Sequence, residues 1–167
     1  MEYISSDTNV WIDFSTIGRI EFPFRLPYTY IMNNDAIEDE LLSPPKLKSE
    51  LINNGLISVE ITIEEFTLAE KYGTQYIKLS TYDRIALAIA KNRGISLLTG
   101  DLALRRAAKK ENVPVLGTLG ILDQLFEGKY IQPDEYLSCL LDLQKYNGQA
   151  VRLPKAELTQ RIQKLQK

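Results

Sequence analysis

The acidic side chains are the residues of this sequence best suited to chemistry, because the usual catalytic alternatives are missing. The 167 residues contain no histidine and a single cysteine, Cys139. Histidine-based triads, Cys–His pairs and zinc sites built from His or Cys ligands are therefore excluded. Neither a G-x-x-x-x-G-K-[ST] nor a G-x-G-x-x-G phosphate-binding loop occurs. Any hydrolytic chemistry must rest on carboxylates, and we expect those carboxylates to hold a hard cation.

The elements that must position these acids alternate between strands and helices. Apolar, β-branched runs bounded by turn residues predict strands over residues 3–6, 28–32, 56–61, 95–99 and 113–116. Apolar periodicity with capping residues predicts helices over 36–42, 47–53, 62–72, 85–93, 102–111, 121–126, 133–146 and 155–167. Residues 8–14 mix apolar and polar side chains and receive no element. The alternation predicts an α/β fold with a largely parallel sheet.

Four acids occupy positions from which their carboxylates could converge: Asp7, Glu40, Asp83 and Asp101. Asp7 and Asp101 each come where a predicted strand ends. Glu40 and Asp83 lie on helices that follow the second and third predicted strands. Ligands of open α/β sheets bind just beyond the carboxyl ends of the strands. The order of elements therefore gives these acids a route to one crevice, where a cation would relieve their mutual repulsion.

Each acid also has a purely structural interpretation, which the sequence alone leaves open. Asp101 can be the N-cap of the helix that follows it. Asp83 can be the acid of a capping box that Ser80 begins. Glu40 lies among other acids and can belong to a solvated helix face. Asp7 is harder to explain in this way, because an unpartnered acid at the end of an apolar strand is costly, although Asn9 or a backbone turn could satisfy it.

Several segments of the chain resemble a PIN domain. Within residues 80–90, Asp83 precedes an Ala-rich helix, and residues 97–101 form a Leu-x-Thr-x-Asp sequence at the end of the next strand. Residues 6–9, Ser-Asp-Thr-Asn, resemble the opening aspartate motif of that family. Residues 37–41 are similar to its V-x-x-E-L helix, which selects Glu40, with Glu38 or Asp39 as alternatives. The resemblance keeps the order Asp, Glu, Asp, Asp and covers residues 3–120.

The resemblance implies a PIN-like three-layer α/β/α fold with a central, mainly parallel sheet of about five strands. The length of 167 residues and the hydrophobic content of 44% suit a single domain with its own core. We therefore expect one domain over residues 1–167, with a nuclease core at 1–123. Residues 124–167 lie beyond the family's core motifs and look like the helical C-terminal extension of some PIN proteins.

PIN domains are metal-dependent nucleases, and many are the toxin halves of bacterial VapBC-type toxin–antitoxin pairs. The resemblance therefore implies an endoribonuclease that hydrolyses RNA phosphodiester bonds with Mg²⁺ or Mn²⁺. The site would comprise Asp7, Asp83 and Asp101 as metal ligands, Glu40 as the residue that orients or deprotonates the attacking water, and Thr99 and Asn9 as supports. Some PIN proteins carry a further acid where this chain has Leu-Ala-Leu at residues 102–104, which leaves the number of metal ions open.

Nucleic-acid binding would need a local basic surface, because the net charge of the whole chain is only −2. Arg105, Arg106 and Lys109 lie on the helix after Asp101 and could hold RNA phosphates, or could simply form a solvated face. Besides RNA as substrate, the resemblance suggests an antitoxin protein as partner and a homodimer as assembly. The last predicted helix carries an apolar stripe for packing within the chain or against a partner: Leu158, Ile162 and Leu165.

The sequence predicts a cytoplasmic protein. No window of eighteen apolar residues predicts a membrane helix, no signal peptide is recognisable, and a lone cysteine suits a reducing compartment. One rival reading is a catalytically inactive PIN-like module that binds RNA or protein. A phosphohydrolase or receiver-like protein would place paired aspartates at the first strand end, where this chain has Asp7-Thr8-Asn9. In a pure interaction protein, the order of the four acids would be a coincidence.

Overall fold

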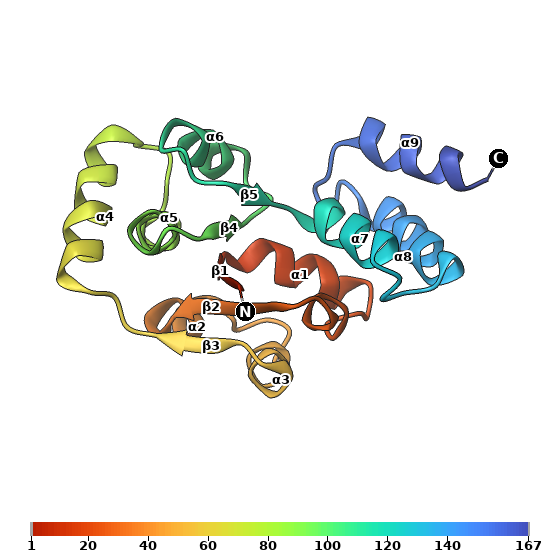
Figure 1. The fold of residues 1–167 in the computed structure, drawn as a ribbon, viewed down its shortest axis with the longest axis horizontal. Coiled ribbons are helices and arrows are strands. Elements are labelled where there is room, and N and C mark those ends of the chain that lie inside the picture. The colour runs from red at the N-terminus through yellow and green to blue at the C-terminus, as the bar shows by residue number, and fades with distance from the viewer. Residues whose placement is uncertain (1, 167) are drawn as a thin grey trace.

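A parallel sheet of five strands lies at the centre of the computed structural model, which describes residues 2–166 (Figure 1). The strands are β1 (Glu2–Ser6), β2 (Tyr28–Asn33), β3 (Ile57–Val59), β4 (Ser96–Leu98) and β5 (Val115–Leu116). Their order is β3-β2-β1-β4-β5, and every neighbouring pair is parallel. The chain places β2 and β3 on one side of β1, and then places β4 and β5 on its other side. The carboxyl ends of β1 and β4 thus form the topological switch point, where α/β sheets bind ligands.

Helices connect the strands and continue beyond the last one. Within residues 2–166 they are α1 (Thr8–Thr16), α2 (Asn34–Glu40), α3 (Leu47–Asn54), α4 (Ile63–Gln75), α5 (Thr81–Arg93), α6 (Leu102–Lys110), α7 (Thr118–Glu127), α8 (Pro133–Tyr146) and α9 (Lys155–Leu165), with a 3₁₀ turn η1 (Phe22–Arg25). In Figure 1, α4, α5 and α6 lie together on one side of the sheet, and α1, α7 and α8 gather on the other. The predicted three-layer α/β/α fold with a parallel sheet is confirmed.

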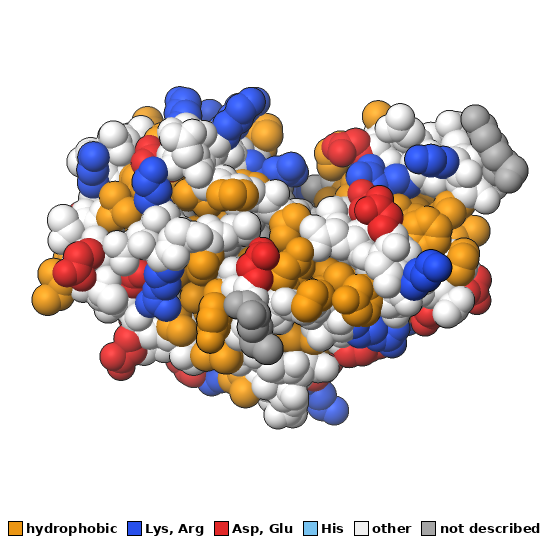
Figure 2. Space-filling model, viewed as in Figure 1, with side chains coloured by type: hydrophobic (Ala, Val, Ile, Leu, Met, Phe, Trp, Pro, Cys, Tyr) orange, Lys and Arg blue, Asp and Glu red, His pale blue; other side chains and the backbone are white. Residues whose placement is uncertain are grey.

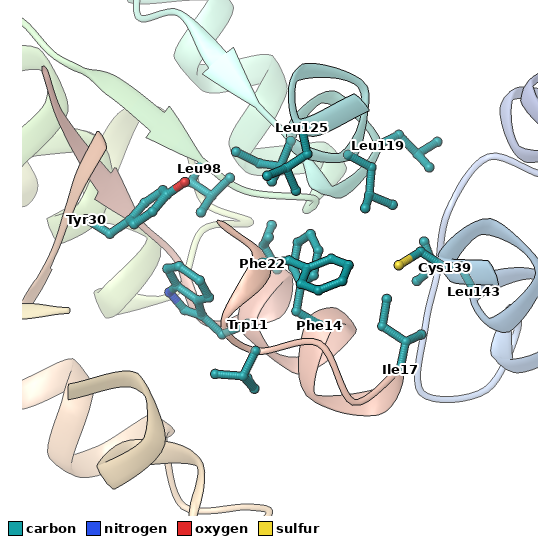
Figure 3. Close-up of a cluster of buried hydrophobic side chains, with 14 of the residues drawn as sticks. Trp11, Phe14, Ile17, Phe22, Tyr30, Leu98, Leu119, Leu125, Cys139 and Leu143 are labelled. Carbon is teal, nitrogen blue, oxygen red and sulfur yellow. The ribbon is translucent and has the colours of Figure 1, made fainter. Parts of the chain in front are cut away.

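Each face of the sheet has its own apolar core. Leu97 and Leu98 are neighbours in β4 and point to opposite faces, as successive strand residues do. Leu98 belongs to the larger core, in which Trp11 and Phe14 of α1 approach side chains of α7 and α8 (Figure 3). Leu97 belongs to the smaller core, formed with α4, α5 and α6. These two cores hold β4 from both sides, whereas Ile4 anchors β1 in the larger core and Ser5 donates a hydrogen bond to the Ala86 carbonyl of α5 on the opposite face.

The C-terminal helices add to the larger core. Leu158 and Ile162 of α9 are 1% and 6% exposed and join the same cluster as Cys139 of α8. The apolar stripe of the last helix therefore packs within the chain. Residue 167, the end of the predicted last helix, lies outside the described residues.

Residues 8–14 form most of a helix that the sequence reading missed. The helix is α1, and it begins at once after β1 because the side chain of Asp7 caps it. Val10, Trp11 and Phe14 are all fully buried, at the spacing of one helical face. The β-branched and aromatic residues of this segment have only modest helix propensity, so tertiary burial decides its conformation.

The other differences concern element boundaries. The strands predicted over 56–61 and 113–116 are shorter, at Ile57–Val59 and Val115–Leu116. The helix predicted over 121–126 is longer and begins at Thr118. Among the described residues, no helix is long and apolar enough to cross a membrane.

Candidate active site

Asp7 occupies the switch point, between the end of the central strand and the first turn of α1. One carboxylate oxygen accepts a hydrogen bond from the backbone N–H of Thr8, and the other accepts one from the hydroxyl of Thr99, both at 2.9 Å. The residue is only 7% exposed. Two directed bonds and burial therefore fix this carboxylate more tightly than an ordinary surface acid.

The loop after β4 is tied to the loop after β1 by side-chain hydrogen bonds. The Thr99 hydroxyl that donates to Asp7 also accepts from the backbone N–H of Asp101, at 3.1 Å. The side chain of Asn9 accepts from the backbone N–H of Gly100, at 3.0 Å. Asp101 caps α6 by accepting from the N–H of Leu104, at 2.9 Å. The relative positions of Asp7 and Asp101 are thus set by Thr99 and Asn9.

The other two acids come from helices that flank these loops. Glu40 is the last residue of α2, and one of its oxygens accepts a hydrogen bond from the Thr8 hydroxyl at 2.9 Å. Asp83 lies in the first turn of α5 and forms a capping box with Ser80. In that box, the Ser80 N–H donates to the Asp83 carboxylate at 3.0 Å. The capping roles proposed from the sequence for Asp83 and Asp101 are both real.

The two acids considered as substitutes for Glu40 lie differently. Glu38 is exposed and forms an ion pair with Lys48. Asp39 accepts a hydrogen bond from the Tyr82 hydroxyl and borders the same pocket as Glu40.

The structure brings the four predicted site acids to one pocket of about 440 Å³. Its lining residues are Asp7, Thr8, Asn9, Ile12, Asp39, Glu40, Asp83 and Asp101. Thr99 lies behind Asp7 and is fully buried. Capping a helix and lining a ligand pocket are therefore not exclusive for these acids, because the first turns of α1, α5 and α6 all meet here.

Burial and repulsion between neighbouring carboxylates make ionisation of Asp7, Glu40 and Asp83 less favourable. Burial, and then the charge of Asp83, raise the pKa of the Asp7 carboxyl to about 7, against hydrogen bonds from Thr8 and Thr99 that lower it. Burial is also the main reason that the pKa values of Glu40 and Asp83 are raised. Carboxylates held together in this way gain most from a nearby positive charge.

The oxygen-rich lining suits a hard cation. Its charged side chains are all Asp or Glu, whose carboxylate oxygens are the ligands that Mg²⁺ and Mn²⁺ prefer. Zinc sites in proteins usually contain His or Cys ligands instead. Within residues 2–166, Glu40 and Asp101 each keep one oxygen that accepts no hydrogen bond. Across the same described residues, no group of three or more acids is already placed so that it could hold a metal ion. Coordination would therefore need side-chain adjustment and water ligands, and Mg²⁺ commonly keeps several waters.

The basic residues proposed to hold RNA lie outside this pocket. Arg105, Arg106 and Lys109 are exposed on α6, where they border a separate depression with Val113 and Val115. Arg105 alone among the three also faces the C-terminal segment across a groove.

Two further polar residues were missed from the sequence. Thr8 donates its backbone N–H to Asp7 and its hydroxyl to Glu40, but this role depends on α1, which was not predicted. Asp13, which lies on the same helix, is buried, and its carboxylate accepts a 2.6 Å hydrogen bond from the Thr118 hydroxyl. Burial raises the pKa of Asp13 to about 6, against the Thr118 bond that lowers it. If residues 8–16 had been predicted as a helix, Asp13 would have fallen on the same helix face as Asn9, four residues earlier.

Comparison with known families agrees with the geometry. The family model DUF3368, described as a PIN domain, matches residues 3–167, nearly the whole chain. No curated protein and no solved structure matches the chain. Because this match spans nearly the whole chain, the protein belongs to the PIN-domain family, whose members are generally nucleases.

Proposed function

We propose that this protein is a metal-dependent endoribonuclease that hydrolyses RNA phosphodiester bonds. The observation that carries the proposal is the meeting of Asp7, Glu40, Asp83 and Asp101 in one pocket at the switch point of the sheet. Asp7 is buried and the other three acids are partly buried, so their combined negative charge is costly and a divalent cation offsets that cost. Membership of a nuclease family supports the same conclusion.

Asp7, Asp83 and Asp101 would hold Mg²⁺ or Mn²⁺. When bound, such an ion lowers the pKa of water and offsets the negative charge that develops on the phosphate oxygens. The hydrogen bond from Thr99 orients the Asp7 carboxylate, and the bond from Gly100 to Asn9 keeps the Asp101 loop beside it. Pre-organised ligands of this kind lower the cost of binding.

Glu40 would orient the attacking water and accept its proton. The Thr8 hydroxyl fixes one Glu40 oxygen, so the other oxygen is available to a water molecule in the pocket. Burial raises the pKa of Glu40, which makes its carboxylate a stronger base than a solvated glutamate.

The finer biological role is also a proposal. We propose a toxin of a toxin–antitoxin pair, cytoplasmic and homodimeric, on the strength of the sequence resemblance to VapC-type proteins. The alternative is a PIN-like module that binds RNA or protein without cutting it. Its support is that no group of three or more acids among residues 2–166 is already placed so that it could hold a metal ion.

Cleavage of a circular single-stranded RNA tests the enzymatic proposal, because only an endonuclease can open a circle. With Mn²⁺ present, we expect Glu40→Gln to cut about 10² to 10⁴ times more slowly than wild type. Glu38→Gln is the matched control on the same helix, since Glu38 is exposed and paired with Lys48. It should cut within about twofold of wild type.

Equal rates for the two variants would refute the role of Glu40. A wild-type protein that leaves a diverse RNA pool intact in both Mg²⁺ and Mn²⁺ would favour the non-cutting module.

A further inference from the structure

A groove of about 630 Å³ runs between α6 and the C-terminal segment. Its walls include the residues Gly100, Leu102, Arg105, Gly117, Arg152 and Arg161. Figure 2 shows the molecule hollowed between the α6 side and the α9 side, with basic side chains near both edges. Of the site and RNA-binding residues proposed from the sequence, Arg105 is the one that lines this groove.

The groove is continuous with the acid pocket. A smaller hollow of about 340 Å³ lies between them and shares Gly100, Leu102 and Arg152 with the groove. The same hollow shares Asn9, Ile12 and Asp101 with the acid pocket. A chain molecule lying in the groove can therefore pass over Asp101 and reach the carboxylates.

The side chains of two arginines face this path and are not engaged in an ion pair with any residue that the structure describes. Arg105 on α6 and Arg152 on the C-terminal side are exposed, and neither guanidinium forms a hydrogen bond or ion pair with any residue of the described range 2–166. Arg161 differs, because Asp123 binds its guanidinium through two nitrogens at 2.7 and 2.9 Å. The positive charge available to a ligand thus comes from Arg105 and Arg152, one on each wall.

Arg152 is presented by a loop that the structure holds firmly. Its neighbour Val151 is fully buried, and the side chain of Asn147 exchanges two hydrogen bonds, of 2.8 and 3.0 Å, with the backbone of Leu153. Gly148 donates to the Val151 carbonyl at 2.8 Å and has a φ of 91°, which strongly favours glycine. Because the loop is already ordered, it would lose little conformational entropy when a ligand binds Arg152.

We propose that this groove is the substrate track of the enzyme, and that Arg105 and Arg152 bind phosphates of single-stranded RNA adjacent to the scissile bond. The inference rests on the proposed nuclease function and gives the C-terminal segment a part in it. Guanidinium groups match phosphate oxygens in geometry and charge. Leu102, which is 61% exposed between the groove and the carboxylates, offers an apolar surface to an unpaired base. Continuity with the acid pocket favours a substrate strand over a protein ligand.

Binding of a fluorescein-labelled single-stranded RNA of about 12 nucleotides tests the track. The titration is made in EDTA, which prevents cleavage, at several salt concentrations. Loss of one phosphate contact should reduce the slope of log K against log salt by about 0.7, which amounts to about eightfold weaker binding at about 50 mM salt. We expect this effect for Arg105→Ala and for Arg152→Ala. Lys71→Ala is the control, because Lys71 is an exposed cation on α4 that does not line the groove. It should change binding by less than about twofold.

The outcomes separate this inference from the nuclease proposal. Weaker RNA binding by both groove variants supports the track, even if no metal supports cleavage. Equal binding by wild type and both variants overturns it, even if the protein cuts RNA, and so does a wild type that binds no RNA. Loss of binding to an acidic peptide of polyglutamate, with RNA binding unchanged, would assign the groove to a protein partner and likewise overturn the proposal. Circular dichroism of each variant checks that it is folded.

Discussion

Replacing Asp7 with asparagine should stabilise the metal-free protein at mildly alkaline pH, although it removes a proposed metal ligand. Burial, followed by the charge of Asp83, raises the pKa of the Asp7 carboxyl from 3.8 to about 7. The folded protein therefore binds this proton more tightly than the unfolded chain does. Ionisation of Asp7 must then cost stability progressively as the pH rises from 3.8 through about 7. Asparagine carries no such charge and remains a good N-cap for α1.

The magnitude follows from the same values. A rise of the pKa from 3.8 to about 7 corresponds to about 4 kcal/mol of unfolding free energy above pH 7. Solvent screening reduces this little, because Asp7 is only 7% exposed. Asparagine loses the hydrogen bond that Thr99 donates to the second carboxylate oxygen, which offsets about 1 kcal/mol. We expect a net gain of about 3 kcal/mol at about pH 8, and no gain at about pH 4.

Urea denaturation in EDTA at a series of pH values, followed by fluorescence of the single tryptophan, measures this difference. Asp134→Asn is the control, because Asp134 is an exposed aspartate in the first turn of α8. It should change stability by less than about 0.5 kcal/mol. Added Mn²⁺ should stabilise the wild type but not Asp7→Asn. If Asp7→Asn is less stable than wild type at about pH 8 without metal, then the folded state does not disfavour ionisation of Asp7, and the reasoning is wrong.

Three further predictions concern the supports of the site and of the fold. Thr99→Val removes a donor to buried Asp7, so it should cost about 2 kcal/mol in urea denaturation and lower Mn²⁺ affinity about tenfold; unchanged affinity would show that Thr99 does not position the ligand. Although burial raises the pKa of Glu65, hydrogen bonds from Arg93 help lower it to about 2, so Glu65→Gln should cost about 3 kcal/mol at neutral pH. That cost should shrink as the pH falls from 4.5 towards about 2, and a constant cost would contradict the assignment. Leu158→Ala should cost about 3 kcal/mol within one cooperative transition; a separate early transition would mean that α9 does not share the main core.

Local sequence patterns were sufficient to predict the parallel sheet, whereas the choice of Glu40 and the convergence of the four acids rested on the resemblance to PIN domains. Strands were recognisable because they are short apolar runs that end at turn residues or acids, as at Asp7 and Asp101. The same patterns could not decide between a capping and a catalytic role for Asp83 and Asp101. The structure explains why: the first turns of their helices open into the acid pocket, so one carboxylate can cap its helix and still face the pocket.

Features that depend on contacts between distant segments could not be predicted. The helix α1 forms because Trp11 and Phe14 are buried by segments far along the chain, and its own residues give only a weak helical signal. Arg152 comes to the groove because Val151 and Asn147 anchor a loop more than a hundred residues from Asp7. No spacing rule within the sequence connects Arg152 to Asp101, since the fold alone makes them neighbours of one hollow.

Calorimetric titration of Mn²⁺, with RNA cleavage followed on the same preparations, tests the central claim most directly. We predict that the wild type binds Mn²⁺ at millimolar concentration or below and cuts RNA. Asp7→Asn and Asp101→Asn should remain folded but lose both properties, because each removes a carboxylate of the acid pocket. A wild type that binds neither Mn²⁺ nor Mg²⁺ at millimolar concentration, with both variants equally well folded, would contradict the account. The four acids would then serve only as helix caps and polar lining.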